Sequence, residues 1–455
     1  MNQSLWDATL PDELRVDRAP LTADRDADVC IVGAGYTGLW TAYHLVVADP
    51  TLQVVVVQAD PVGFGASGRN GGWCSALFPA PLEQVAERSS KRAALALQAA
   101  LVDSLRQVGE FGEREGLDIH FRQGGYLHVG TSELQLERVR EEAEDTLAFD
   151  PSCGTRLLSA AEASERIAAA GVVGGAWYPH VAAVHPARLA HAAAIAAERR
   201  GVVIHEHTRA LEVGPRRVRT AGGTVRADVV VLATEGYTPA LPGHRRDVIP
   251  LYSMMIATEP LGADVWEQIG WQGRDTFNDG RQFIIYAQRT VDDRIAIGGR
   301  GAPYHFGSRV DPSFDASPHV HDSIHQSLVE LFPSVADAAI THRWGGPLAA
   351  PRDWMPSVNW SPATGMAQAG GYVGDGVCCA HLAGRTLAAL IAGGDHELTT
   401  LPWVGHRSRR WEPEPLRWLG VSAGLKLTAG IDEREAATGR PARLRYRLGR
   451  ALQGR

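Results

Sequence analysis

The feature that most constrains this fold is a glycine-rich turn between an apolar segment and a helical pattern near the start of the chain. Residues 29–32 are apolar, the turn reads Gly33-Ala34-Gly35-Tyr36-Thr37-Gly38, and a second apolar segment, Gln53–Gln58, follows the helix. Strand, helix and strand form a βαβ unit of about 30 residues, in which the three glycines permit the turn, the approach of a pyrophosphate and close helix packing. A glycine-rich turn in another α/β fold is the alternative, but the context favours a dinucleotide site.

Composition excludes several classes of protein. The chain has 455 residues, 45% hydrophobic and 21% charged, which is typical of a globular protein with two or three domains. A net charge of −7 argues against a nucleic-acid partner. We find no signal peptide, no apolar run long enough to cross a membrane and no paired cysteine motif for a metal. We therefore expect a cytoplasmic protein without a metal site, and leave its oligomeric state open.

The order of the predicted elements indicates two domains folded through each other. Segments of α/β character recur along the chain and alternate with segments that are rich in helices or in antiparallel strands. We predict an α/β fold, α+β overall, with a parallel central sheet in the dinucleotide domain and a mainly antiparallel sheet in a discontinuous substrate domain. The predicted segments are 1–80, 155–245 and 335–400 for the first domain, 81–154 and 246–334 for the second, and 401–455 for a basic helical extension.

Three further segments point from a generic dinucleotide to a flavin. The Gly63–Gly72 loop combines many glycines with serine, arginine and asparagine, so it can wrap phosphates. The apolar segment 229–233 ends at Ala233-Thr234-Glu235-Gly236, like a strand that returns beneath the adenine side. The late turn Gly370–Gly376 opens a helix whose N-terminus can face the flavin edge where negative charge grows on reduction.

With these motifs the chain resembles the D-amino-acid-oxidase-like family of FAD-dependent oxidoreductases, which includes glycine oxidase and sarcosine oxidase, and within it the γ-glutamylputrescine-oxidase-like branch. The resemblance is carried by the three glycine-rich segments, by Ala233–Gly236, and by the segments 256–260, 298–299, 344–347 and 384–385. It implies oxidation of a C–N bond to an imine, which is hydrolysed to an aldehyde and an amine or ammonia. Oxygen would then reoxidise the flavin and give hydrogen peroxide.

The resemblance also implies which residues hold the cofactor. We predict contacts to FAD from Gly33, Gly35, Tyr36, Thr37, Gly38, Gln58, Gly65, Ala66, Ser67, Arg69, Asn70, Gly71, Gly72, Ala233, Thr234, Glu235, Gly236, Gly346, Gly371, Gly374, Asp375, Gly376 and Val377. Relatives place an acidic residue on the ribose where this chain has Gln58, with Asp60 two residues further on. In some relatives a side chain is bonded covalently to FAD. The corresponding positions of this chain hold other residues, so we predict non-covalent FAD.

Two departures from the family pattern concern the reaction. Amino-acid oxidases carry an arginine that binds the substrate carboxylate at the position where this chain has Leu348, which favours an amine, although Arg352 or Arg300 could replace that arginine. The position of the lysine that assists oxygen in sarcosine-oxidase relatives is Ala296. An electron acceptor other than oxygen therefore stays open.

The substrate site is less well defined by the sequence. Tyr252, Tyr286, Trp344 and His381 are candidates because their segments should face the flavin and an amine favours an aromatic slot. The alternative functions are an oxidase or dehydrogenase of amino acids or N-methyl amino acids, and a flavoprotein subunit that docks a partner through the Trp- and Arg-rich extension.

Overall fold

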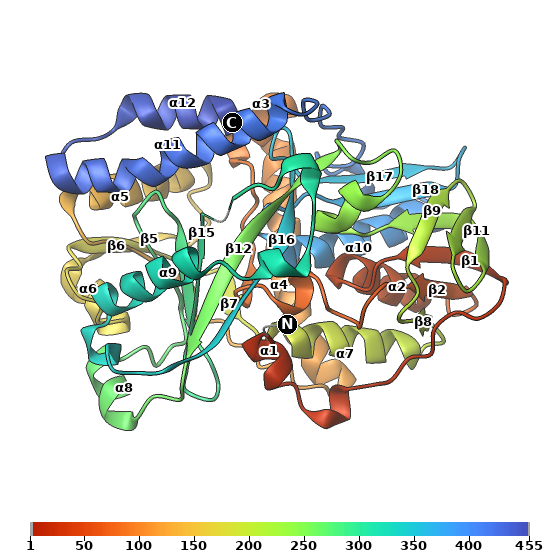
Figure 1. Cartoon of the computed structure of the whole chain (residues 1–455), viewed down its shortest axis with the longest axis horizontal. Helices are drawn as coiled ribbons and strands as arrows, with labels where there is room; N and C mark the ends of the chain where they lie inside the picture. The colour runs from red at the N-terminus through yellow and green to blue at the C-terminus, as the bar shows by residue number, and fades with distance from the viewer. Residues whose placement is uncertain (1–2, 302, 454–455) are drawn as a thin grey trace.

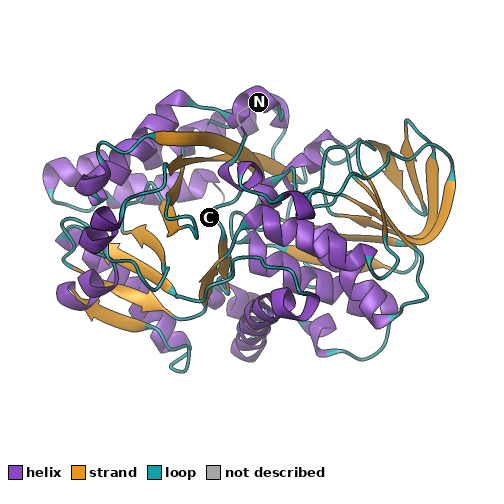
Figure 2. Ribbon diagram, turned by 90° about the horizontal axis from the view of Figure 1, so that it is seen from below, coloured by secondary structure: helices purple, strands orange, loops and turns teal. Residues whose placement is uncertain are grey.

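Two sheets at opposite ends of the molecule organise the fold. The computed structural model describes residues 3–301 and 303–453. The first sheet has the strand order β17-β18-β11-β1-β2-β8, with β10 and β9 added beside β11, and the second has the order β16-β12-β15-β14-β13-β4-β6-β5. Helices α2, α7 and α10 lie beside the first sheet, and α5, α6, α8 and α9 surround the second (Figure 1), with the same separation in the perpendicular view (Figure 2).

The helices have the following bounds: α1 Leu5–Ala8, α2 Tyr36–Ala48, α3 Leu82–Arg88, α4 Lys91–Glu115, α5 Glu133–Phe149, α6 Ala160–Arg166, α7 Pro186–Glu198, α8 Ala263–Ile269, α9 Pro318–Leu331, α10 Gly376–Ala392, α11 Leu416–Thr438 and α12 Arg443–Gln453. The strands are β1 Arg25–Val32, β2 Val54–Val57, β3 Trp73–Ser75, β4 Tyr126–Gly130, β5 Arg156–Ser159, β6 Gly174–Tyr178, β7 Val181–Ala183, β8 Val203–His205, β9 Ala210–Gly214, β10 Arg217–Thr220, β11 Thr224–Leu232, β12 Val248–Thr258, β13 Thr276–Asp279, β14 Ile285–Arg289, β15 Ile295–Arg300, β16 Ile340–Pro351, β17 Ser357–Ser361 and β18 Met366–Gly370.

The first sheet has a parallel centre because its strands are apolar on both faces. β1 pairs in parallel with β11 and β2, β2 with β8, and β11 with β18. The strand β2 consists of four buried valines, and a strand buried on both faces needs helices on both sides. The parallel central sheet predicted from the sequence is confirmed.

The second sheet is mainly antiparallel, as predicted, with β13 and β4 as a parallel pair. Three strands belong to it that the predicted segments assigned to the first domain: β16, β5 and β6. The reason for β16 is its partner, because β12 pairs with it from Val248–Pro351 to Thr258–Ile340. β5 and β6 extend the same sheet beyond β4.

The carboxyl ends of β1 and β11 meet the N-termini of α2 and α10, and this arrangement positions the candidate site. Residues of α2, α7 and α10 belong to one buried apolar cluster with β1 and β2, whereas β12 to β15 and α9 build a separate one. Within the described part of the chain, no helix combines the length and apolar character that crossing a membrane requires.

Candidate active site

The first glycine-rich turn is built from close backbone contacts. Gly33 has φ +110°, and a Cβ there would lie 2.5 Å from the carbonyl oxygen of Ala233 at the end of β11. A Cβ on Gly38 would overlap the carbonyl oxygen of Gly33 and lie 3.1 Å from its carbon. β1, α2 and β11 can approach this closely because both residues lack a side chain.

Two side chains from the next segments hold this turn. The Gln58 amide oxygen accepts the Ala34 N–H at 2.8 Å, and the Ser67 hydroxyl accepts the Tyr36 N–H at 2.8 Å. Asp60 is half exposed and lies 3.8 Å from Arg209. The N-cap residue Gly35 has no side chain to bond the start of α2, so beyond the Tyr36 N–H that Ser67 accepts, the first turn offers N–H groups and the positive dipole end to an anion. Gln58 thus supports the turn, and its predicted contact with the ribose stays a prediction.

The Gly63–Gly72 loop folds onto itself through Asn70. The Asn70 amide donates to the carbonyls of Ala66 and Ser67, both at 3.0 Å, and its oxygen accepts the Gly72 N–H at 2.8 Å. These bonds fix the loop as a rigid cradle beside the first turn.

Side chains from distant segments hold the same loop. The Arg69 guanidinium pairs with Asp315 at 2.7 Å, and it lies 4.2 Å from the Phe64 ring centroid. Burial raises the pKa of the Asp315 carboxyl, although Arg69 opposes that shift. The indole N–H of Trp344 donates to the Arg69 carbonyl and that of Trp6 to the Asn70 carbonyl. Sequence patterns did not indicate Trp6 or Asp315, because neither belongs to a recognisable motif.

Glu235 joins the end of β11 to the late glycine-rich turn. Its carboxylate accepts the N–H groups of Gly371 and Tyr372, at 2.9 and 3.2 Å. Burial raises its pKa to about 7 against the opposing effect of these hydrogen bonds. Asp375 occupies the N-cap position of α10. The turn therefore presents the N-terminus of α10 next to the end of β11.

The arrangement fits the predicted cofactor. Glycines at the closest approaches, two helix N-termini and the self-bonded loop provide backbone N–H groups and space for the phosphates of a dinucleotide. The residues that would hold FAD come from the first turn, the Gly63–Gly72 loop, the end of β11 and the late turn. Among the described residues, no group of three or more His, Cys, Asp or Glu side chains is arranged to hold a metal ion.

A cavity of about 820 Å³ lies on the side of the second sheet. Tyr252 and Leu348 line it together with aromatic residues and several carboxylates. Besides Tyr252, the Phe, Tyr, Trp, Asp and Glu residues of the lining are Phe78, Tyr126, Phe149, Tyr178, Phe283, Trp354, Trp411, Tyr446, Glu83, Glu141, Glu142, Asp145, Asp150, Asp279 and Asp353. An apolar and aromatic cavity with acidic groups suits a cationic organic molecule.

The four residues predicted to line the substrate pocket do not all lie at the cavity. Tyr252 lines the cavity, and burial raises the pKa of its phenol. Tyr286 lies beside it, since its hydroxyl is 2.7 Å from that of Ser253, which also lines the cavity. Trp344 is buried and supports the cofactor loop, as described above. His381 is buried between α10 and α2, with its ring 4.7 Å from that of Trp40, so the structure does not bring it together with the other three.

Leu348 was predicted to stand where amino-acid oxidases have a carboxylate-binding arginine, with Arg352 or Arg300 as possible replacements for that arginine. Leu348 is half-buried on β16 and lines the cavity. Arg352 is already paired with Glu412 at 3.1 Å and stacks on Trp411 at 4.9 Å. The side chain of Arg300 lies outside the described part of the structure.

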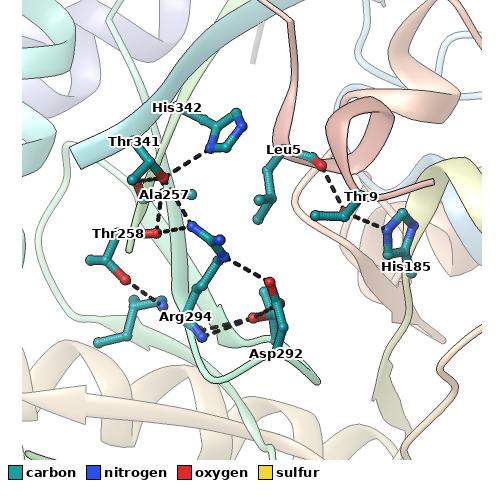
Figure 3. Close-up of polar contacts among 11 residues, drawn as sticks. Leu5, Thr9, His185, Ala257, Thr258, Asp292, Arg294, Thr341 and His342 are labelled. Carbon is teal, nitrogen blue, oxygen red and sulfur yellow. Dashed lines mark hydrogen bonds and ion pairs between the residues drawn. The ribbon is translucent and has the colours of Figure 1, made fainter. Parts of the chain in front are cut away.

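Ala296 lies on β15, an inner strand of the second sheet, and is fully buried. Nearby, Arg294 donates to Asp292 at 2.7 Å and to the Thr258 carbonyl at 2.9 Å, and these bonds, drawn in Figure 3, fix the start of β15. Ala296, which we predicted from the family resemblance to stand at the lysine position, is thus a small apolar residue of the core.

His185 has a structural place at the start of α7. Its Nδ1 accepts the Arg188 N–H at 3.2 Å, and its Nε2 lies 3.0 Å from the Thr9 hydroxyl, so it joins α1 to α7 (Figure 3). Burial lowers the pKa of this imidazole to about 3. His185 is therefore the N-cap residue of α7.

The largest contribution that sequence patterns missed comes from the C-terminal helices. Val421, Leu425 and Thr428 of α11 and Tyr446 of α12 line the cavity. Their segment shows no motif, and a basic, Trp-rich tail gives no signal of what it covers.

Comparisons with known proteins agree with this geometry. The family profile described as DAO, FAD dependent oxidoreductase, matches residues 28–390. The chain is 30% identical to the gamma-glutamylputrescine oxidoreductase of Escherichia coli (strain K12), with 80% of this chain and 84% of the relative covered. It is also 30% identical to the probable oxidoreductase OrdL of Rhizobium meliloti (strain 1021), with 88% and 90% covered.

Solved structures show the same fold. Glycine oxidase from Geobacillus kaustophilus matches with a TM-score of 0.69 at 21% identity, over 85% of this chain and 100% of that one. L-proline dehydrogenase from P. horikoshii matches with a TM-score of 0.68 at 20% identity, over 82% and 96%. The chain therefore belongs to the DAO family of FAD-dependent oxidoreductases, and it is an enzyme that uses FAD to oxidise amine or amino-acid-like donors.

Proposed function

We propose that this enzyme is an amine oxidase: it oxidises the C–N bond of a primary or secondary amine to an imine, water hydrolyses the imine, and oxygen accepts the electrons to give hydrogen peroxide. The observation that carries the proposal is Leu348 in the cavity wall, at the position where amino-acid oxidases place an arginine. A substrate carboxylate buried against leucine would lose its hydration without gaining a cation partner.

The cations near the cavity are already neutralised. The described lining contains Arg138 and Arg281, and both pair with carboxylates: Arg138 with Glu435 at 2.7 Å and Arg281 with Asp279 at 2.6 Å. The exposed carboxylates Glu141 and Glu142 lie on the same cavity, where they favour entry of a positively charged amine. Charge in the cavity therefore favours amines over zwitterionic amino acids.

The protein would contribute to the reaction by positioning the substrate and the cofactor and by excluding water. FAD, when bound, supplies a two-electron acceptor. Tyr252 and Leu348 would form the wall against which the reacting carbon is held, and Tyr286 is fixed by its bond to Ser253. Trp344 would hold the cofactor loop in place through its hydrogen bond to the Arg69 carbonyl.

Relatives' names support both the proposal and one competitor. The gamma-glutamylputrescine oxidoreductase is named for an amine, whereas D-amino acid dehydrogenase 2 of Pseudomonas aeruginosa, 28% identical over 72% of this chain, is named for an amino acid and a dehydrogenase reaction. Buried Ala296 in place of a lysine favours a slower reaction with oxygen. The alternative is thus an amino-acid or N-methyl-amino-acid enzyme that passes electrons to another acceptor.

The test uses purified yellow protein. Each member of a panel of amines, amino acids and N-methyl amino acids is added anaerobically, flavin bleaching is followed at its visible absorbance maximum, and air is then admitted while peroxide is measured. Bleaching by amines followed by rapid reoxidation and peroxide supports an amine oxidase. Bleaching by amino acids alone refutes the substrate class, and reoxidation by a dye but not by air refutes oxygen as the acceptor.

A further inference from the structure

The C-terminal helices lie outside the part of the chain that the family profile matches, which ends at residue 390. They nevertheless form part of the cavity, through Val421, Leu425 and Thr428 of α11 and Tyr446 of α12. Figure 1 shows α11 and α12 side by side across the top of the second sheet, with α5 beneath them. This wall therefore comes from residues that follow the matched part of the chain.

Polar bonds fasten α11 to other residues of the cavity. The Asp432 carboxylate accepts the N–H groups of Gln282 and Phe283, at 2.7 and 2.6 Å. Glu435, one turn further on, pairs with Arg138 of α5 at 2.7 Å. Gln282, Phe283 and Arg138 themselves line the cavity, so the same bonds that dock α11 also set the shape of the lining.

The segment before α11 is fastened as well. The Glu414 carboxylate accepts the Tyr304 hydroxyl at 2.9 Å and the Gly307 N–H at 2.8 Å. The Trp411 indole donates to the Ala350 carbonyl at 2.9 Å, and its ring packs in a buried cluster that includes Val421. Bonds just before α11 and in its C-terminal half make this helix a fixed wall of the site.

The inner surface of this wall is largely apolar. Val421 is buried, and Leu425 is half-buried and packs against the same cluster while it lines the cavity. Such a side chain can contact the alkyl part of a ligand, but it offers no partner to a charged group.

We propose that the C-terminal helices determine which amines this enzyme accepts, with Leu425 as the residue that contacts the apolar, non-reacting part of the substrate and Asp432 as the residue that positions the wall. The inference rests on the proposed amine oxidation and adds the substrate class: amines with an extended alkyl or aryl chain. Short amines reach the reacting position without touching α11, whereas long ones must pack against it.

The first test narrows the cavity by placing a larger side chain on α11. Leu425→Trp is compared with Lys426→Ala, a control at the exposed neighbouring position, on straight-chain primary amines of increasing length. Because the larger tryptophan side chain would occupy the space of the substrate's chain, and a misfit of about one methylene in an apolar pocket changes specificity by about tenfold or more, we expect kcat/KM of Leu425→Trp to fall at least about tenfold for the longest amines and to stay within about twofold for the shortest. An equal change at every length, or no change, overturns the role of Leu425.

The second test loosens the wall and needs no substrate. Asp432→Asn removes the anionic acceptor of two backbone N–H groups, and Glu433→Gln makes the same chemical change at an exposed neighbour. We expect acrylamide to quench the fluorescence of bound flavin more strongly in Asp432→Asn, while Glu433→Gln matches the unchanged protein. Equal quenching in all three proteins refutes the role of Asp432 in positioning this wall.

The two tests separate the inference from the function on which it rests. If no amine bleaches the flavin of the unchanged protein, the proposed function fails, and the quenching comparison still decides whether α11 covers the site. If amines are oxidised but Leu425→Trp leaves the length profile unchanged, the function stands and the inference fails.

Discussion

Replacing Gly38 with alanine tests the geometry of the cofactor turn through one methyl group. A Cβ at this position lies closer than 3.0 Å to the Gly33 carbonyl oxygen, a separation that Cβ atoms essentially never show, and the neighbour is backbone that has no rotamer to change. Overpacking of this kind costs about 1–3 kcal/mol. Alanine's better helix propensity recovers about 1 kcal/mol, so a loss of up to about 2 kcal/mol in stability remains.

The larger effect should appear in cofactor binding. Moving α2 away from β1 displaces the N–H groups at its first turn, and one hydrogen bond to a charged group contributes about 1.5–3 kcal/mol. Since 1.4 kcal/mol corresponds to a factor of ten, the dissociation constant of FAD should rise about tenfold or more.

The assay combines thermal unfolding in excess FAD with a fluorescence titration of FAD. Gly420→Ala is the matched control, because Gly420 also lies inside a helix but has nothing within 4 Å of its added Cβ. We expect Gly420→Ala to be as stable as the unchanged protein or more so, by about 0.5–1 kcal/mol. If Gly38→Ala binds FAD with unchanged affinity, the reasoning about the close approach at this turn is wrong.

Three other predictions concern the cavity and the cofactor loop. Leu348→Arg should create a partner for a carboxylate, so that flavin reduction by α-amino acids speeds up while that by amines slows about tenfold or more; a uniform loss on both classes contradicts the assignment of this position. Glu235 has a pKa raised from 4.5 to about 7, so the stability that this one carboxyl contributes should be greatest below pH 4.5 and fall by about 2–3 kcal/mol as the pH rises to 7. Glu235→Gln, which resembles the protonated form, should remove that difference in denaturant unfolding at pH 5 and 8, and an unchanged pH dependence would contradict it. Trp344→Phe deletes the indole N–H that binds the Arg69 carbonyl, and it should raise the FAD dissociation constant about five- to tenfold with little loss of secondary structure by circular dichroism.

The fold and the first half of the cofactor site could be predicted from local patterns. The turn at Gly33–Gly38 and the all-valine strand β2 carry their structural meaning within a few residues, because backbone conformation and two-sided burial limit which side chains are tolerated. The sheet membership of β16 could not be predicted in this way, since it depends on pairing with β12, about 90 residues earlier in the chain.

The substrate site depended on long-range contacts that no motif encodes. His381 has the same apolar helical context as a pocket residue, yet the packing of α10 against α2 turns it toward Trp40. The sequence left Arg352 as a possible partner for a substrate carboxylate. In the structure it contacts Glu412 and Trp411, about 60 residues later in the chain, so its guanidinium is already paired. The role of α11 in lining the cavity could not be predicted from the sequence for the same reason, because it depends on which distant residues the helix packs against.

The central claim, an FAD enzyme that selects amines over amino acids, is tested most directly by anaerobic stopped-flow reduction with matched pairs. Each pair consists of an α-amino acid and the amine that lacks its carboxylate, such as lysine and cadaverine or phenylalanine and phenethylamine, so only the carboxylate differs. With Leu348 in the cavity wall, we predict that the limiting rate of flavin reduction divided by the dissociation constant is at least about a hundredfold higher for the amine in each pair that reacts. A ratio near one, or a preference for the amino acid, would contradict the account.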